Sequence, residues 1–284
     1  MADVNVAGQL DEIEKRIMAG LKDFQRATVN RIDELYRAGQ MRVLVSDEVG
    51  LGKTLIARGT IAKLAKLQKE SGDKLVKVVY VCSNASIAEQ NLNKLRITSE
   101  LKPESTSSSR LSMQHLNIFR QENDTELLNR YIQLIPLTPD TSFRMTSGAG
   151  IVSERALMYA ILRRMPELSM YRKALEVAMA DKAVGQWDGW ARDWYETQVK
   201  ECDKTSGGKY LAYMLDKLSV ELNMRADEDN TVLDMIISMC KQIRSNRYKQ
   251  QNNNAVIGKL RVIFAKISLD KLEPDLVIMD EFQR

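Results

Sequence analysis

The chain has 284 residues, 44% of them hydrophobic, and its 42 basic and 38 acidic residues leave a net charge of +4. This length and apolar content predict a globular protein of one large or two smaller domains, and the even charge balance does not by itself indicate a nucleic-acid partner. No apolar run approaches the roughly 18 residues of a membrane span, and the N-terminus is acidic and polar, so we expect a cytoplasmic protein without a signal peptide.

Two amphipathic helices are expected first, over residues 9–20 and 22–38, the second with an apolar stripe formed by Phe24, Thr28, Ile32 and Leu35. Gly39 suits a helix stop. The next run, Met41 to Val45, is short, apolar and β-branched, and predicts a strand buried on both faces.

The stretch SDEVGLGKT, residues 46–54, follows this strand and ends like a phosphate-binding loop, although Asp47 stands where the general pattern has its first glycine. A helical pattern comes next, so the order is strand, glycine loop, helix. Backbone N–H groups of such a loop point at phosphate oxygens, the lysine adds a positive charge, and the threonine hydroxyl can ligate Mg²⁺. The predicted nucleotide-binding residues here are Gly50, Leu51, Gly52, Lys53 and Thr54.

A second strand and helix follow. Residues 76–82 (VKVVYVC) read as a strand, and residues 86–89 form a capping box that opens a helix through Leu95. Residues 131–137 predict a further strand, and the serine-rich stretch 102–110 predicts a surface loop. Strand and helix units in series favour a parallel sheet.

From about residue 153 to 250 the pattern is helical throughout, which predicts an all-helical insertion. A helix is expected over 255–270, and we divide the chain into 1–150, the first part of an ATP-binding lobe; 151–254, the insertion; and 255–284, the end of the lobe.

Several side chains admit two interpretations. The three tryptophans Trp187, Trp190 and Trp194 fit a buried helical stripe better than a base-stacking platform. A solvated helix face explains the densest basic stretch better than a phosphate track; it comprises Arg244, Arg247, Lys249, Lys259 and Arg261. Three widely spaced cysteines and one histidine, His115, exclude a disulfide framework and an ordinary zinc site, so we expect buried thiols and a structural histidine.

The chain closes with a segment, residues 275–279, that predicts a buried strand and delivers Asp280 and Glu281 at its carboxyl end, where parallel sheets place their ligand sites. Asp280 can hold Mg²⁺, and Glu281 can orient or deprotonate an attacking water. With Lys53, these two carboxylates are the predicted catalytic residues.

The combination DEVGLGKT and VIMDEFQR, preceded by LKDFQRATVNRI, resembles the first RecA-like lobe of superfamily 2 helicases and translocases, in their Swi/Snf-related, DEAD/DEAH-like bacterial branch. Asp47 is usual in that branch. The resemblance implies that Gln25 reads the adenine edge, for which its amide can both donate and accept. It also implies that Ser83, Asn84 and Ser86, in VYVCSNASIAEQNLNKL, contact nucleic-acid phosphates.

The resulting expectation is an α/β P-loop NTPase, with a RecA-like parallel sheet and a large helical insertion, that uses ATP and Mg²⁺ to move on nucleic acid, DNA favoured over RNA. The resemblance covers residues 20–150 and 255–284 and implies a fragment that ends after the Asp-Glu motif. A second RecA-like lobe with an arginine finger would act in cis or in trans, and the isolated chain would hydrolyse ATP poorly. Two alternatives stay open: an ATP-driven protein remodeller on nucleic acid, or a non-catalytic fragment that binds nucleotide, or a protein partner through the insertion.

Overall fold

The computed structural model describes residues 2–46, 50–72, 75–101, 110–123, 131–138, 142, 148–226, 229–245 and 250–280. The chain forms two compact units. Unit 1 consists of residues 1–109, 124–141 and 273–284, and unit 2 consists of residues 110–123 and 142–272. None of the helices in the described ranges is both long and apolar enough to cross a membrane.

The core of unit 1 is a parallel sheet of three described strands in the order β2-β1-β3. Their bounds are β1 Val76–Cys82, β2 Ile132–Leu137 and β3 Leu276–Asp280. Each lies on a segment expected to be a strand, because each is a nearly continuous apolar run. In the register, Cys82 of β1 pairs with Asp280 of β3, so these two strands end at the same edge of the sheet.

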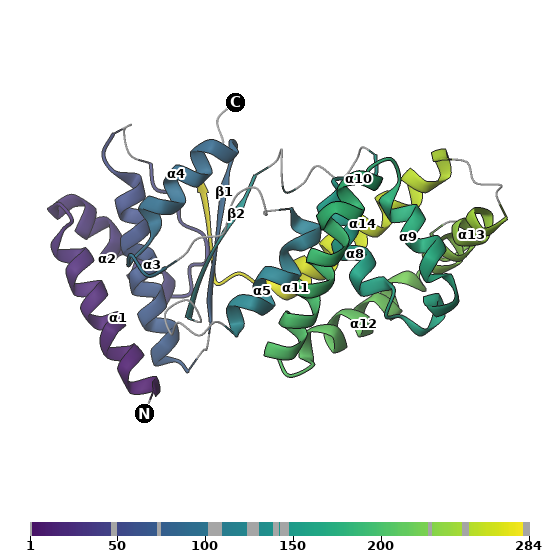
Figure 1. Cartoon of the computed structure of the whole chain (residues 1–284). Coiled ribbons are helices and arrows are strands. Elements are labelled where there is room, and N and C mark those ends of the chain that lie inside the picture. Colours follow the sequence, from purple (N-terminus) through teal and green to yellow (C-terminus); the bar gives the residue numbers. More distant parts are fainter. Residues whose placement is uncertain are drawn as a thin grey trace. The chain divides into compact units, whose positions relative to one another are not determined.

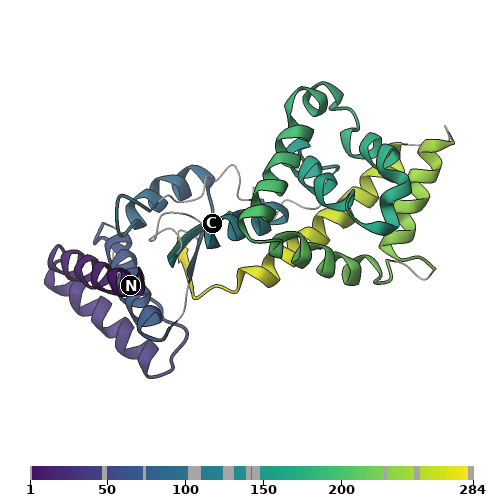
Figure 2. The ribbon, with the colours of Figure 1, turned by 60° about the horizontal axis from the view of Figure 1, so that its bottom comes forward.

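Four described helices pack around this sheet: α1 Ala2–Ala19, α2 Asp23–Arg37, α3 Lys53–Glu70 and α4 Ala85–Leu95. Figure 1 shows α1, α2 and α3 together to one side of the sheet, and Figure 2 shows α1 and α2 lying alongside each other. One apolar cluster joins α1, α3, α4 and the strands, and includes Leu10, Ile61, Val78, Leu92 and Leu276. The helices expected over 9–20 and 22–38 are therefore confirmed.

In the first two turns of α2 the buried positions lie one residue beyond the expected stripe. Gln25, Val29 and Ile32 are buried, whereas Phe24 is 42% exposed. The prediction that Phe24 belongs to the buried stripe was wrong. A polar side chain, Gln25, occupies the inward position instead, and a search for apolar residues at helical spacing does not detect a buried polar residue.

Residues 41–46 form no strand, which corrects the expectation of a buried strand over Met41–Val45. Val43 and Val45 pack partly against a small cluster between α2 and α3, but Met41 is 83% exposed and Leu44 is 90% exposed. A strand buried on both faces needs neighbours to pair with and layers on either side. None of the three described strands pairs with this segment, and only its valine face is covered.

Unit 2 is helical in its described residues. Its elements are η2 Leu111–Met113, α5 Gln114–Glu122, α8 Val152–Leu162, η3 Pro166–Tyr171, α9 Arg172–Ala180, α10 Val184–Gln186, the π-helical turn η4 Trp187–Ala191, α11 Arg192–Thr205, α12 Lys209–Leu222, α13 Val232–Arg244 and α14 Gln250–Leu272. Figures 1 and 2 show the long helix α14 running among the others. It contributes Leu260, Phe264 and Ile267 to the core.

The helix expected over 255–270 thus exists, but it belongs to the helical unit and not to the unit that holds the sheet. Residues 110–123 also join unit 2. An amphipathic pattern predicts that a helix has an apolar face but does not say which core this face meets.

The expected tryptophan stripe is correct only for Trp187, which is 1% exposed, whereas Trp190 is 47% and Trp194 is 56% exposed. The chain forms a π-helical turn at Trp187–Ala191, which holds more residues per turn than an α-helix. The buried stripe therefore continues from Trp187 through Ala191 and Val199, and the other two tryptophans turn outward.

Candidate nucleotide-binding site

The glycine loop leads directly into a helix. Gly50 has φ +90° and Gly52 has φ +82°, a left-handed backbone that favours glycine. Gly52 is the N-cap of α3, so Lys53 and Thr54 form the first turn of this helix, and the carbonyl of Gly52 accepts from the N–H groups of Leu55 and Ile56. The first N–H groups of a helix have no partner within it, and together with the helix dipole they form a site for an anion.

The other end of α3 fixes its direction relative to the sheet. Gln68 donates from Nε2 to Asp275, directly before β3, at 3.2 Å, and Lys69 donates from Nζ to the hydroxyl of Tyr131, directly before β2, at 2.6 Å. Both contacts lie at the amino ends of strands. Helix α3 therefore runs antiparallel to the strands, and its first turn points toward the edge at which Asp280 lies.

Gln25 is held against the loop from α2. It is 3% exposed; its Nε2 donates to the carbonyl of Leu51 at 2.8 Å, and its Oε1 accepts from the backbone N–H of Lys22 at 3.0 Å. A Cβ at Gly52 would lie 2.6 Å from that Nε2, so a side chain at residue 52 would force the Gln25 amide to move. An amide has two N–H groups and two acceptor lone pairs, so one N–H group and one lone pair of Gln25 take no part in these two contacts.

Asp280 ends β3 and is bound from two other elements. The hydroxyl of Tyr80, on β1, donates to Oδ2 of Asp280 at 2.8 Å. Nδ2 of Asn91, on α4, donates to the Tyr80 hydroxyl at 2.9 Å and lies 3.5 Å from the same Oδ2. Glu281 and Asp47 lie outside the described residues.

The loop after β1 lies at the same edge of the sheet as Asp280, because Cys82 and Asp280 are register partners. Asn84 is the N-cap of α4; its Oδ1 accepts from the N–H groups of Ser86, at 2.8 Å, and Ile87. The expected capping box with Ser86 as the cap was wrong, because Asn84 already performs this role two residues earlier. Ser83 is half-buried, and the side chains of Asn84 and Ser86 are exposed.

Sequence reasoning missed Tyr80 and Asn91. Tyr80 stands in an apolar run and is 1% exposed, so that the pattern predicts a core residue and nothing more. The position of Asn91 could have been noticed in the sequence, because it lies at helical spacing from Ala88 and Leu95 on the inward face of α4. A buried amide needs a polar partner, so an asparagine at this position predicts a polar contact in the core.

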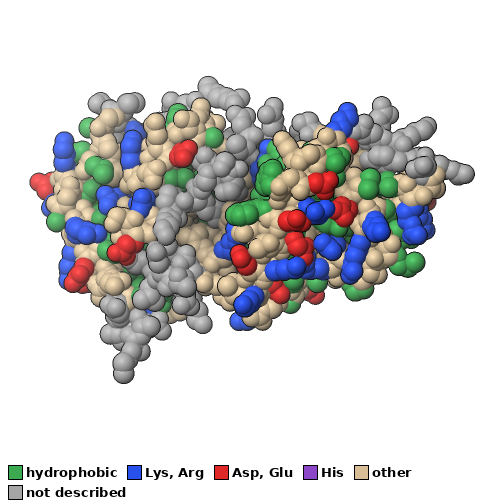
Figure 3. All heavy atoms as spheres, viewed as in Figure 1, with side chains coloured by type: hydrophobic (Ala, Val, Ile, Leu, Met, Phe, Trp, Pro, Cys, Tyr) green, Lys and Arg blue, Asp and Glu red, His purple; other side chains and the backbone are tan. Residues whose placement is uncertain are grey.

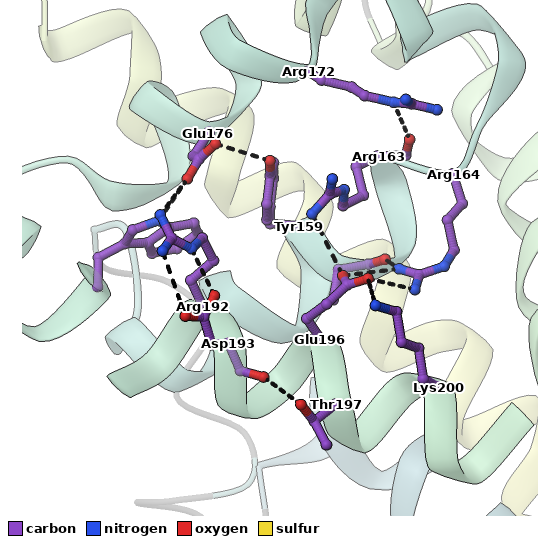
Figure 4. A network of polar contacts seen from close by, with 12 residues as sticks. Tyr159, Arg163, Arg164, Arg172, Glu176, Arg192, Asp193, Glu196, Thr197 and Lys200 are labelled. Atoms are coloured by element: carbon purple, nitrogen blue, oxygen red, sulfur yellow. Dashed lines mark hydrogen bonds and ion pairs between the residues drawn. The ribbon is translucent and has the colours of Figure 1, made fainter. Parts of the chain in front are cut away.

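Some of the charged side chains of unit 2 form ion pairs with one another. Figure 3 shows Lys and Arg beside Asp and Glu over part of its helices. Figure 4 shows one such group: Arg192 reaches Glu176 and Asp193, while Arg164 makes a bidentate contact to Glu196 at 2.7 and 3.1 Å. These contacts stabilise the unit.

The basic residues between 244 and 261 were expected to form a solvated helix face, and the structure differs from this expectation at one of them. Arg261 is 1% exposed and pairs with the buried Glu154 at 2.9 Å, so the expected solvated face is wrong for this residue. Arg244 is exposed, whereas Arg247 and Lys249 lie outside the described residues. All three cysteines are free and buried, as expected.

Residues 19–135 match the family described as "Type III restriction enzyme, res subunit". The matched segment includes Gln25, the glycine loop, α3, β1 and α4, and it indicates a helicase-like ATPase lobe of superfamily 2. The match covers less than half of the chain. No curated protein and no solved structure matches the chain significantly.

Proposed function

We propose that unit 1 is the ATP-binding lobe of an ATP-dependent motor that moves on nucleic acid. The observation that carries the proposal is the turn with two left-handed glycines, Gly50 and Gly52, that leads into α3 at Lys53 within a segment matching a helicase-like ATPase family. The direction of α3 toward the edge that holds Asp280 supports the same assignment.

In this proposal the backbone from Gly50 to Thr54 binds the β- and γ-phosphates of ATP, Lys53 neutralises their charge, and Gln25 meets the adenine edge. Glu281 orients or deprotonates the attacking water.

The donor set fits Mg²⁺. The ion prefers one or two carboxylates together with phosphate oxygens and water, and Asp280 and Thr54 provide one carboxylate and one hydroxyl. Among the described residues no three His, Cys, Asp or Glu side chains are grouped to hold a metal by themselves, so the ion would arrive with the nucleotide. When bound, Mg²⁺ would neutralise charge on the phosphates.

Ser83, Asn84 and Ser86 are our candidates for nucleic-acid contact, because they lie at a helix N-terminus beside the same edge of the sheet. We favour DNA as the track, the Swi/Snf-related branch as the affiliation, and a second RecA-like lobe, in cis or in trans, as the source of an arginine finger. Unit 2 then contacts the substrate or a protein partner. The exposed side chains of Trp190 and Trp194 provide an apolar surface for such a contact.

The test is ATP affinity by calorimetry on the 284-residue chain, with ATP turnover measured in the presence and absence of single- and double-stranded DNA and RNA. Lys53→Ala should abolish ATP binding, because the phosphates lose their positive partner. Glu281→Gln should retain binding and lose turnover. Lys15→Ala is the matched control, since Lys15 is a 74% exposed lysine on α1. Equal ATP affinity in the Lys53 variant and the wild type would contradict the nucleotide site.

The turnover data separate the remaining alternatives. Stimulation by nucleic acid without strand separation would favour a remodeller that displaces proteins. ATP binding with no turnover under any condition would favour a lobe that depends on a second one, or a non-catalytic fragment.

A further inference from the structure

We propose that Tyr80 and Asn91 are positioning residues that hold the carboxylate of Asp280 in the orientation in which it binds Mg²⁺ together with the nucleotide. The inference rests on the proposed function. It is drawn from a chain of hydrogen bonds that connects α4, β1 and β3 within unit 1.

The donors in this chain have a fixed order. The amide nitrogen of Asn91 can only donate, so at 2.9 Å it uses the Tyr80 oxygen as an acceptor, and the Tyr80 hydroxyl then donates to Oδ2 of Asp280 at 2.8 Å. A carboxylate oxygen can only accept, so Tyr80 is the donor in its bond to Asp280.

This arrangement leaves one carboxylate oxygen for a ligand. Both donors approach Oδ2, and among the contacts of the described residues none involves Oδ1. A carboxylate held through one oxygen presents the other in a defined direction. Hydrogen bonds to ligating carboxylates of this kind raise metal affinity, because the ligand does not have to be ordered when the ion binds.

Neither residue type is explained by packing alone. Tyr80 is 1% exposed and belongs to the apolar cluster of unit 1, where a phenylalanine would fill the space of the ring without burying a hydroxyl. Asn91 is 8% exposed and lies between Ala88 and Leu95 on the inward face of α4, where a leucine would pack. Buried polar groups cost free energy unless they are hydrogen-bonded, and here the bonds converge on the one carboxylate of the proposed metal site.

The experiment measures how strongly Mg²⁺ raises ATP affinity. ATP is titrated calorimetrically into the 284-residue chain in EDTA and at a series of MgCl₂ concentrations, and the ratio of the two dissociation constants is compared between variants. Tyr80→Phe removes only the hydroxyl group of the side chain. It should reduce the Mg²⁺-dependent gain in ATP affinity by about tenfold and leave the affinity in EDTA unchanged, because phosphate contacts with α3 do not involve Tyr80.

Tyr131→Phe is the matched control. Tyr131 is another tyrosine of unit 1 with a hydrogen-bonded hydroxyl, but it lies at the amino ends of the strands, beside Lys69. Both affinities should stay at the wild-type values. Asn91→Leu, which leaves the Tyr80 hydroxyl without its donor, should lower the ratio in the same direction as Tyr80→Phe, and it decides the question if Tyr80→Phe fails to fold in a thermal melt.

The outcomes are distinguishable. A wild-type chain that binds no ATP would overturn the proposed function and this inference with it. If the wild type binds ATP with a Mg²⁺-dependent gain and both Tyr80→Phe and Asn91→Leu keep that gain, the positioning role is wrong while the nucleotide site stands. The same conclusion follows if the wild type binds ATP with no gain from Mg²⁺.

Discussion

At the scale of single residues, His115 shows how burial sets a proton equilibrium. The only histidine of the chain lies on α5 in the core of unit 2, fully buried, with Nδ1 3.0 Å from the hydroxyl of Tyr210 and its ring beside Phe264. Burial lowers the pKa of His115 from 6.5 to about 3, and the backbone of Ser112 opposes this only in part. It is therefore neutral in the folded chain at neutral pH, consistent with a structural role.

This shift predicts a pH dependence of stability. Between pH 6.5 and about 3 the unfolded chain binds a proton at His115 that the folded chain does not. The free energy of unfolding should therefore fall by up to about 1.4 kcal/mol per pH unit on acidification from this residue alone. His115→Gln should remove that part of the slope. Urea unfolding at pH 5 and pH 7, followed by tryptophan fluorescence, checks it, and an identical slope in the variant would refute it.

At the scale of elements, the two ends of α3 provide a matched pair of glycines. Gly52 at its N-cap and Gly72 beyond its C-cap both have positive φ, but only Gly52 has a close neighbour, since a Cβ there would meet Nε2 of Gln25 at 2.6 Å. Gly72→Ala should cost about 1–2 kcal/mol of unfolding free energy for the left-handed backbone. Gly52→Ala should cost more and also weaken ATP binding, because Gln25 and the loop must separate. Urea unfolding and calorimetry measure both effects, and equal losses in the two variants would contradict the contact.

One carboxylate of α11 pairs with the two arginines that directly follow α8. Glu196 on α11 binds Arg164, Arg163 and Lys200, and its side chain is 18% exposed (Figure 4). Burial alone would raise the pKa of Glu196, but the hydrogen bond and charge of Arg164, with Arg163 and Lys200, lower it on balance.

Glu196→Gln should therefore destabilise unit 2 by about 1–2 kcal/mol at neutral pH, between the values for exposed and buried ion pairs. A carboxylate with a lowered pKa stabilises the fold above its unfolded pKa and loses this effect in acid. The difference between variant and wild type should thus shrink as the pH falls below 4.5, the ordinary value for this group. Glu201→Gln, an exposed position on the same helix, is the control. A difference independent of pH would argue against the ion pairs.

At the scale of the whole molecule, each unit has its own apolar core, so each can unfold as a unit of its own. All three tryptophans lie in unit 2, whereas the proposed nucleotide site lies in unit 1. ATP with Mg²⁺ at about 100 times its dissociation constant should stabilise unit 1 by about 2.7 kcal/mol. A thermal scan should therefore show a calorimetric transition that ATP raises and a tryptophan-fluorescence transition that ATP leaves in place. One shared transition that shifts as a whole would show that the two units unfold together.

The sequence by itself predicted the strands at 76–82, 131–137 and 275–279, each within one residue of its observed bounds, the glycine loop before α3, and the helices found among the described residues of 153–250. These features depend on local patterns: continuous apolar runs, glycines at left-handed positions, and apolar residues at helical spacing. The family match at residues 19–135 covers the glycine loop and the strand at 76–82. The roles assigned to Gln25, Lys53, Asp280 and Glu281 stay predictions.

Only the tertiary structure decided which surfaces each element meets. It left Met41 and Leu44 exposed, assigned α14 to unit 2, turned Trp190 and Trp194 outward, and gave the cap of α4 to Asn84. It also brought Tyr80, Asn91 and Asp280 together over separations of up to 200 residues. Sequence periodicity records which face of an element is apolar, but the partner of that face depends on long-range packing between segments whose distance along the chain carries no signal.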